Sequence, residues 1–289
     1  MGPSTDNICG DKTQRDTGRP VPALAHLWLV LTTAAICIPL VWMVLTSLKG
    51  PQQIAAAPYA WWPSPWRWQN YLEAIAVIPF FRYLGNSILL CLGSVLGTLA
   101  SCSLVAYGFS RLRWAGRDLL FGVLIATMLL PWQVTMIPRF LVIRELGLYD
   151  SLWALILPKF FGEAFYIFLL RQFFMTIPQE MIDVARVDGC SEMGVLWRVV
   201  LPLARPALAT VALLEFIATW NDYGGPLLYL NDPDRFPLAY GLEQFVSSHS
   251  SETHLLLAAS VIFTVPMVLL FLLTQRLFVR GIATTGIKG

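Results

Sequence analysis

The stretch IPQEMIDVARVDGCSEMGVLWRVVLPLARP, residues 177–206, is a charged island between two long apolar segments. Apolar residues recur at helical spacing on both sides of Gly189, and glycine suits the left-handed conformation that ends a helix. The pattern predicts two short amphipathic helices, 178–188 and 191–200, joined by a glycine elbow. Their expected apolar stripes are Met181, Val184 and Ala185 in the first helix, and Met193, Leu196, Val199 and Val200 in the second. Such a pair makes a docking surface and carries no catalytic constellation.

Residues that favour the start or the end of a helix lie at the expected ends of both predicted helices. Pro178 suits a first helical position, where no hydrogen-bond donor is lost, and Glu180 and Asp183 lie near the positive end of the helix dipole. Ser191 suits the cap of the second helix. Leu201-Pro202 is expected to end that helix, because proline removes a backbone donor.

The same spacing resembles the EAA motif of ABC importer permeases. The order is Asp183-Val184-Ala185, then Gly189, then Val199-x-Leu201-Pro202. That family prefers Glu, Ala and often Ile where this chain has Asp183, Val184 and Val199, so three positions depart conservatively while the spacing is intact. The alternative is an ordinary amphipathic loop between membrane helices. The resemblance implies contact with an ATPase subunit through Glu180, Asp183, Val184, Ala185, Asp188, Gly189, Leu201 and Pro202.

The composition indicates a membrane protein. Of 289 residues, 56% are hydrophobic and 13% are charged, and the mean hydropathy of +0.62 is far from that of a soluble domain. The net charge of +2 comes without a basic block interleaved with aromatics, which argues against nucleic-acid binding. The five cysteines show neither CxxC nor metal-ligand spacing, so we expect no disulfide framework and no metal site.

Six apolar segments are each long enough to cross a bilayer, at about 20 residues per helix. They predict an all-α, polytopic protein with six transmembrane helices, at residues 20–48, 83–110, 119–138, 151–174, 207–230 and 254–275. The first segment is too long for a signal-peptide core and no small-residue cleavage site follows it, so we expect it to be retained. The expected organisation is a tail at 1–19, a transmembrane domain at 20–280 that includes the 177–206 loop, and a tail at 281–289.

Two features stand out around the second segment. The preceding loop, 49–82, is rich in tryptophan, which suits the lipid–water interface better than the alternative of sugar stacking, and a short surface helix is expected after Asn70. Within the second segment, small residues at Gly93, Ser94, Gly97, Ala100 and Ser101 predict the close approach of another helix.

Polar residues within the apolar segments are candidates for a solute path, because polar groups at membrane depth are costly unless they face water or a bundle interior. Gln133 follows a Leu130-Pro131 break, and broken membrane helices usually line a cavity. Asn221 and Asp222 are explained equally well by a solute path and by a hydrogen-bond network between helices. Asn86, which opens the second segment, is the fourth candidate.

One charge pair lies inside the fourth segment. Lys159 and Glu163 are separated by one helical turn. The pair is either a substrate contact or, as we favour, an ion pair that satisfies itself at i, i+4.

Positive charges orient the chain. With the N-terminus inside, the inner segments hold thirteen Lys and Arg residues and the outer segments hold six, while Lys159 is left within a helix. The excess of positive charge predicts that both termini and the 177–206 loop are cytoplasmic. A cytoplasmic docking loop in an importer requires a cytoplasmic motor.

That motor is expected from a partner. The sequence contains no GxxxxGK[ST] phosphate loop, no HExxH motif and no Ser-His-Asp set, and its three histidines are scattered. An integral membrane enzyme is therefore a weaker alternative. A secondary transporter is the other alternative, but it is expected to show internal repeats or coupling-ion carboxylates, and no clear repeat is present.

The resemblance extends over nearly the whole chain. The six-span layout, Asn86-Ser87, the Leu130-Pro131 break, Trp220-Asn221-Asp222 and the ending Gly-Ile-Lys-Gly resemble carbohydrate-uptake permeases related to the smaller maltose permease. The resemblance implies a type I ABC importer permease in a prokaryotic plasma membrane. Its implied partners are membrane lipid, a second permease, two ATPase subunits that bind ATP and Mg, and an extracytoplasmic solute-binding protein. It also implies a sugar, polyol or glycerol-phosphate-type solute, and no cofactor held by this chain.

Overall fold

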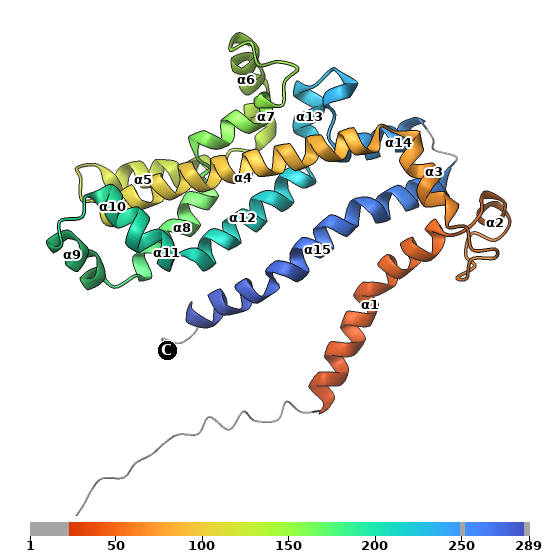
Figure 1. Ribbon diagram of the computed structural model, residues 1–289, viewed down its shortest axis with the longest axis horizontal. Helices are drawn as coiled ribbons and strands as arrows, with labels where there is room; N and C mark the ends of the chain where they lie inside the picture. Colours follow the sequence, from red (N-terminus) through yellow and green to blue (C-terminus); the bar gives the residue numbers. More distant parts are fainter. Residues whose placement is uncertain (1–22, 249–251, 286–289) are drawn as a thin grey trace, which may run out of the picture. The chain divides into compact units, whose positions relative to one another are not determined.

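The computed structural model describes residues 23–248 and 252–285, and every regular element within those ranges is a helix. The tail predicted at 1–19 lies outside these ranges, as do residues 286–289 of the tail predicted at 281–289. Contacts divide the chain into two compact units, residues 1–43 and 44–289, which are described separately. In chain order the elements are α1 (Ala23–Ser47), α2 (Pro51–Ala56), α3 (Gln69–Val77), α4 (Phe80–Arg111), α5 (Arg117–Thr127), α6 (Trp132–Glu145), α7 (Trp153–Ile156), η1 (Leu157–Phe161), α8 (Ala164–Thr176), α9 (Gln179–Val187), α10 (Glu192–Val195), the π-helical turn η2 (Leu196–Val200), α11 (Leu201–Leu203), α12 (Arg205–Trp220), α13 (Gly224–Tyr229), η3 (Pro233–Arg235), α14 (Leu238–Ser248) and α15 (Thr253–Thr285) (Figure 1).

The described part of the first unit belongs to α1. This 25-residue helix contains no charged residue, and its mean hydropathy reaches 2.2. A helix of that length and character spans a membrane, and its bounds agree with the segment expected at 20–48.

The second unit is built around α4, a 32-residue helix that packs against α8, α12 and η1 (Figure 1). The small residues of α4 explain the close packing. A Cβ added at Gly97 would lie 2.7 Å from a ring carbon of Phe160, and one added at Gly93 would lie 3.0 Å from Ile156. The sequence prediction of a close approach at these glycines is confirmed, and the approaching segment is α7–η1. On its other side the unit is completed by α15, which packs against α3, α12 and α14.

Two pairs of helices are sharply bent. The axes of α5 and α6 differ by 101°, and the break between them contains Leu130-Pro131, as the sequence predicted. The second bend, of 80°, separates Glu192–Leu203 from α12. Four helical segments in the described ranges are long and apolar enough to cross a membrane, and the total rises to six if each bent pair is one span. That total agrees with the six segments expected.

Several expected boundaries differ from the structure. The segment expected at 207–230 is not continuous, because α12 ends at Trp220 and a new helix, α13, begins at Gly224. The side chain of Asp222 starts α13 by accepting a hydrogen bond from the Gly225 amide at 3.0 Å. The segment expected at 151–174 is also divided, at Gly162, which follows η1 and whose φ of +86° and ψ of 151° form an extended conformation that only glycine adopts readily.

Two expectations about the 177–206 loop are also wrong. Pro178 is the residue before the first helical turn of α9 and not its first member. The helical path does not end at Leu201-Pro202 but continues to Leu203, and the chain turns at Ala204. Proline is tolerated there because Pro202 lies in the first turn of α11, directly after the π-helical turn η2, where a missing donor costs little.

Candidate functional site

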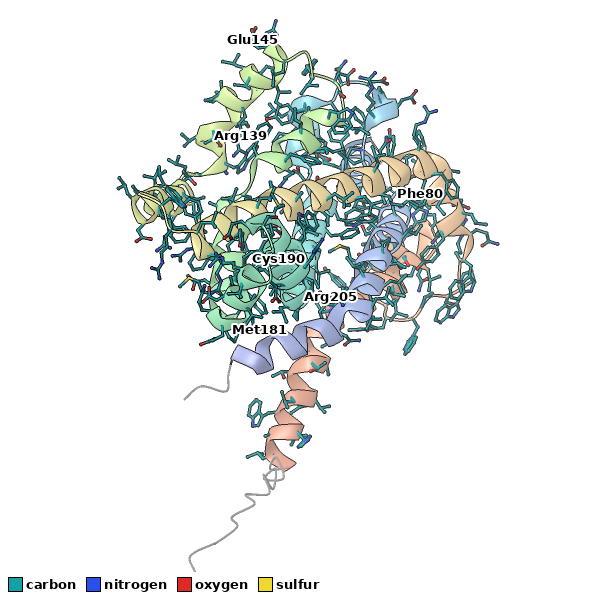
Figure 2. All side chains as sticks on the ribbon, turned by 60° about the vertical axis from the view of Figure 1, so that its left-hand side comes forward. Phe80, Arg139, Glu145, Met181, Cys190 and Arg205 are labelled. Carbon is teal, nitrogen blue, oxygen red and sulfur yellow. The ribbon has the colours of Figure 1, made fainter. Side chains whose placement is uncertain are left out.

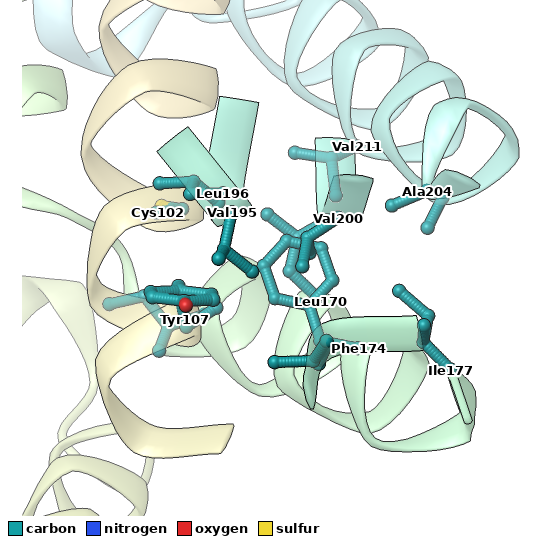
Figure 3. Packing of buried hydrophobic residues seen from close by; sticks show 14 of the residues in the cluster. Cys102, Tyr107, Leu170, Phe174, Ile177, Val195, Leu196, Val200, Ala204 and Val211 are labelled. Carbon is teal, nitrogen blue, oxygen red and sulfur yellow. The ribbon is translucent and has the colours of Figure 1, made fainter. Parts of the chain in front are cut away.

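The loop at 177–206 contains α9, α10, η2 and α11 and is called here the coupling loop, after the role that its resemblance to the EAA motif implies. It is anchored by one apolar face. Ile182, Val195 and Val200 are fully buried. They belong to a cluster that continues into α4 and α8, with Cys102, Tyr107, Leu170 and Phe174 among its members (Figure 3). Burying apolar side chains of this size stabilises the packed loop by roughly 1.5–3 kcal/mol per residue. The loop is therefore held rigidly against the membrane helices.

A second apolar stripe of the coupling loop is exposed. Met181, Val184 and Val187 on α9 are 44%, 61% and 87% exposed, and Trp197 is 61% exposed. Of the predicted stripe of Met181, Val184 and Ala185, only Ala185 is buried, and Ile182 is its buried neighbour. Met193 is likewise exposed, whereas Leu196 and Val200 are buried. Helical spacing identified the apolar positions of α9 but not which of them are buried. The exposed set 181, 184 and 187 and the buried set 182 and 185 both repeat every three residues.

The glycine elbow has the predicted geometry. Gly189 has a φ of +82°, and a Cβ added there would meet no atom within 4 Å. The amide of Gly194 donates to Ser191 Oγ at 3.2 Å, which confirms Ser191 as the cap of α10. Backbone conformation, and not crowding, is the reason that glycine suits position 189.

A polar network ties the two halves of the coupling loop to α4. Arg186 on α9 donates to both carboxylate oxygens of Glu192 on α10, at 2.9 and 3.1 Å. The hydroxyl of Tyr107 on α4 donates to Glu192 Oε2 at 2.5 Å, and Arg186 also pairs with Asp183 at 3.3 Å. Hydrogen bonds from Arg186 and Tyr107 stabilise the carboxylate and lower the pKa of Glu192. The network fixes the angle between α9 and α10.

Arg111, the last residue of α4, makes a second tie. Its guanidinium donates to the backbone carbonyls of Phe174 and Ile177, and to Gln179 Oε1 at 2.9 Å. These contacts join α4 to the end of α8 and the start of α9. Neither Tyr107 nor Arg111 was predicted as a site residue, because the sequence shows no link between the end of α4 and residues 63 to 85 positions later.

The structure places most of the predicted coupling residues on the surface. Glu180, Asp183, Val184, Asp188, Gly189 and Pro202 are exposed, Leu201 is half-buried and Ala185 is buried. Met181 and Cys190 lie on this loop, which is well separated from α6 with Arg139 and Glu145 in both views (Figures 1 and 2). Val184 belongs to the exposed apolar stripe, and Glu180, Asp183 and Asp188 are its neighbours along the chain.

A second candidate site is a cavity of about 230 Å³ between α4, η1 and α12. Its lining includes the polar residues Ser94, Lys159, Thr219 and Asp222, together with Leu90 and Leu155. Of the four residues predicted to line a solute path, Asp222 lines this cavity. Asn86 instead donates to the carbonyls of Asp234 and Phe236 at 2.9 and 3.0 Å, and Asn221 donates to Ile217 at 2.8 Å. Gln133 is exposed at the start of α6.

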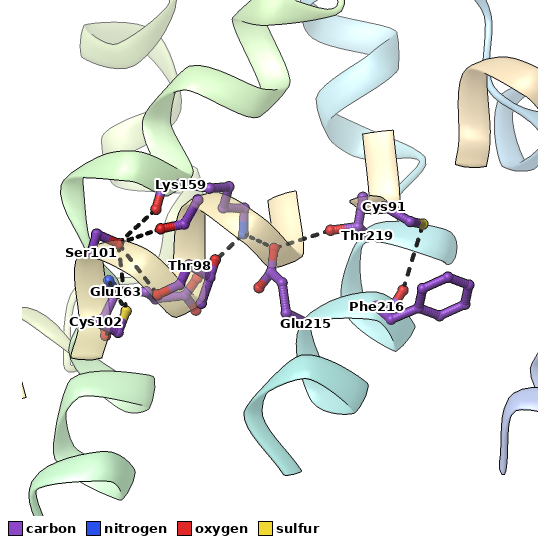
Figure 4. A network of polar contacts seen from close by, with 10 residues as sticks. Cys91, Thr98, Ser101, Cys102, Lys159, Glu163, Glu215, Phe216 and Thr219 are labelled. Atoms are coloured by element: carbon purple, nitrogen blue, oxygen red, sulfur yellow. Dashed lines mark hydrogen bonds and ion pairs between the residues drawn. The ribbon is translucent and has the colours of Figure 1, made fainter. Parts of the chain in front are cut away.

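Lys159 lies at the centre of a partly buried polar network beside this cavity (Figure 4). Its Nζ is 3.3 Å from Glu163 Oε2 and 3.0 Å from Glu215 Oε1, and Glu215 is fully buried. The predicted pair at i, i+4 is confirmed, but Glu215 is a second partner that the sequence analysis did not assign. Glu215 lies 56 residues after Lys159, so only the packing of α12 beside η1 brings the two together. An isolated carboxylate within an apolar helix is the signal that identifies such a residue.

The described residues contain no group of three or more His, Cys, Asp or Glu side chains that is arranged to hold a metal ion.

The sequence is similar to those of known membrane transport proteins. Residues 93–284 match the family described as binding-protein-dependent transport system inner membrane component. The chain is 33% identical to the probable ABC transporter permease protein YurM of Bacillus subtilis, covering 91% of this chain and 87% of that protein. It is 32% identical to the arabinooligosaccharides transport system permease protein AraQ of Bacillus subtilis, covering 73% and 74%, and 32% identical to the sn-glycerol-3-phosphate transport system permease protein UgpE of Yersinia pestis, covering 91% and 96%.

A solved structure has the same architecture. A chain of a bacterial ABC transporter involved in the import of the acidic polysaccharide alginate matches 88% of this chain and 95% of its own length, with a TM-score of 0.78 and 25% identity. The chain therefore belongs to the family of binding-protein-dependent transport system inner membrane components. It is a multi-pass, all-α permease subunit of an ABC importer, and ATP hydrolysis belongs to separate ATPase subunits.

Proposed function

We propose that this permease imports a sugar or a related solute and that the coupling loop at 177–206 transmits ATPase closure to the membrane helices. Both termini and the coupling loop face the cytoplasm of a prokaryotic cell, with tails at 1–19 and 281–289 and the transmembrane domain at 20–280. The ATPase subunits bind ATP and Mg, and this chain holds no cofactor. The excess of thirteen inner over six outer positive charges supports that orientation.

One observation carries the proposal of coupling. The coupling loop combines a buried face that is packed against α4 and α8 with an exposed apolar stripe that includes Met181, Val184 and Val187. Contiguous exposed apolar side chains mark a protein interaction surface. Because the loop is tied to the membrane helices through Tyr107 and Arg111, a displacement of the docked partner moves those helices as well. Glu180, Asp183, Val184, Asp188 and Gly189 belong to the proposed ATPase-contacting surface.

The solute is proposed from the relatives and from the cavity. The names of the relatives include both an uncharged oligosaccharide and an anionic glycerol phosphate, so similarity alone does not choose between them. Asp222 is the best-supported candidate for solute contact, because it lines the cavity. Asn86, Gln133 and Asn221 remain candidates for other positions along the solute path.

The experiment changes the coupling loop without touching a membrane helix. Gly189→Val forces a β-branched residue into a left-handed conformation, which costs roughly 1–2 kcal/mol and misaligns α9 and α10. Asp183→Lys places a positive charge near the start of α9 and removes one of the two carboxylate partners of Arg186. Both variants are expected to insert normally and to lose transport. The measurements are co-purification of the ATPase subunits and binding-protein-stimulated ATP hydrolysis in reconstituted membranes.

Gly116→Val is the matched control. Gly116 also has a positive φ, +84°, and open space around it, but it precedes α5 and lies outside the coupling loop. It is expected to carry the same local strain and to retain stimulated hydrolysis. Full transport by both coupling-loop variants, or an equal loss in the control, contradicts the proposed role.

A further inference from the structure

The cavity between α4, η1 and α12 is surrounded by an excess of negative charge. One ammonium, that of Lys159, lies between the carboxylates of Glu163 and Glu215 (Figure 4). Asp222 adds another carboxylate to the cavity lining. Three carboxylates against one ammonium leave two uncompensated negative charges. Arg139 on α6 is an exposed cation, and counting it as well still leaves one uncompensated negative charge.

The surroundings of Lys159 hold it in this arrangement. Ser101 Oγ donates to the Lys159 carbonyl at 2.9 Å, which fixes the backbone of η1 against α4. Thr219 Oγ1 donates to Glu215 Oε1 at 3.0 Å, so the carboxylate that pairs with Lys159 is itself oriented. Glu215 Oε2 is buried without a hydrogen-bond partner among the described residues. Moving the ammonium away to meet an anionic solute would leave Glu215 buried and unpaired, which is costly.

We propose that this cavity contacts an uncharged, hydroxyl-rich group, such as one neutral sugar ring, and that it disfavours uronates and sugar phosphates. The inference rests on the proposed function of solute import. An ammonium has three N–H donors, and two are engaged by Glu163 and Glu215, so one is available to a hydroxyl oxygen. Asp222 accepts from solute hydroxyls, and Ser94 and Thr219 extend the polar lining. The volume of about 230 Å³ is below the ~300–1,000 Å³ of ligand pockets and suits one ring, not a whole chain.

The charge of the cavity is tested with thiol reagents. Ala218 is exposed and lines the cavity, and it takes no part in the polar network, so Ala218→Cys introduces a small thiol probe. The variant is studied in the complete complex with its partner permease and ATPase subunits, and the parent complex gives the background. Reaction rates are compared for methanethiosulfonates that carry a trimethylammonium or a sulfonate group, each relative to its rate with 2-mercaptoethanol.

The cationic reagent is expected to react on the order of a hundredfold faster than the anionic one after this correction, because one net negative charge at about 10 Å in an effective dielectric of ~20 speeds the first and slows the second by roughly tenfold each. Adding Asp222→Asn should reduce the ratio, and adding Lys159→Gln should increase it. A ratio near one, or faster reaction of the anionic reagent, overturns the proposal.

The solute class is tested with matched pairs on the same variant. Galactose and galacturonate, and glycerol and glycerol 3-phosphate, are added as protectants against the cationic reagent and against the uncharged reagent methyl methanethiosulfonate. Protection by the neutral member of a pair is expected. Stronger protection by an acidic member overturns the charge preference, and protection by none of them overturns the contact site. These outcomes are separate from those of Gly189→Val, because a failed coupling loop leaves the thiol measurements unchanged.

Discussion

At the scale of single residues, absent side chains decide the packing of the membrane helices. Gly97 lets Phe160 of η1 lie directly on α4, and η1 also carries Lys159. A methyl group at Gly97 would overlap the Phe160 ring at 2.7 Å, so η1 or the ring must move. Gly85, on the same helix, has no atom within 4 Å of an added Cβ.

We therefore predict that Gly97→Ala destabilises the permease by about 1–3 kcal/mol, the usual range for overpacking. Gly85→Ala is the control, and it should be neutral or slightly stabilising because alanine is the better helix former. Thermal unfolding of the purified complexes measures both. Equal melting temperatures for the two variants would show that η1 relaxes without cost.

At the same scale, Asp150 holds the loop that includes η3. Its Oδ1 accepts from the amides of Asn231 and Asp232 at 2.9 and 3.0 Å, and its Oδ2 is 3.1 Å from Arg235. Burial opposes ionisation, but the two backbone hydrogen bonds and the charge of Arg235 outweigh it and lower the pKa of Asp150.

A lowered pKa makes this stabilisation depend on pH in one direction. It is fully present above the ordinary carboxyl value of 3.8 and is lost as the pH falls through the lower value of the folded state. The protection of the residue 231–235 amides against hydrogen exchange, measured relative to the intrinsic exchange rate at each pH, should therefore fall in acid below pH 3.8. Asp150→Asn tolerates the residue's positive φ of 58° but lacks the charge, so its exchange should be faster at neutral pH and respond less to acid. An unchanged pH profile in that variant would exclude Asp150 as the cause.

At the scale of elements, α4 connects the coupling loop to the membrane core. Tyr107 and Arg111, one turn apart near the end of α4, contact α10 and α9 respectively. Because both contacts involve charged groups, each hydrogen bond is stronger than a neutral one. We infer that α4 and the coupling loop move as one body.

Tyr107→Phe tests this link, because it removes one hydroxyl and keeps the ring in the apolar cluster. We expect the complex to assemble and binding-protein-stimulated ATP hydrolysis to fall, with basal hydrolysis retained. The lost hydrogen bond to Glu192 is worth about 1.5–3 kcal/mol when the acceptor is charged, and less here because Glu192 is 46% exposed. Tyr149→Phe is the control, since Tyr149 is half-exposed and contacts only the Phe140 ring among its aromatic neighbours. Full stimulation in the Tyr107 variant would contradict the coupling role of α4.

At the scale of the whole molecule, the orientation is open to direct test. Cys190 lies in the coupling loop and is partly exposed. With Cys190 as the only cysteine, a membrane-impermeant thiol reagent should label inverted vesicles and not intact cells. Tyr59→Cys in a background without cysteines should give the opposite result, because Tyr59 is 85% exposed in the loop at 49–82. Labelling of Cys190 from outside would invert the proposed topology.

The sequence by itself determined the features that depend on local chemistry. Apolar runs of sufficient length marked the membrane segments, Pro131 marked the bend between α5 and α6, and Gly189 and Ser191 marked the elbow and cap of the coupling loop. Each of these features depends on a local property of the chain, either the backbone conformation that a residue favours or the preference of one apolar segment for lipid.

Only the tertiary structure decided which residues form sites. It paired Glu215 with Lys159, joined Tyr107 to Glu192, and chose Ile182 over Met181 for the buried face of α9. The partners in the two polar pairs lie 56 and 85 residues apart, and nothing local in either residue specifies the other. Helix packing in a membrane depends on side-chain shape, since apolar faces gain little from leaving lipid, so hydropathy identifies a membrane helix without specifying its neighbours.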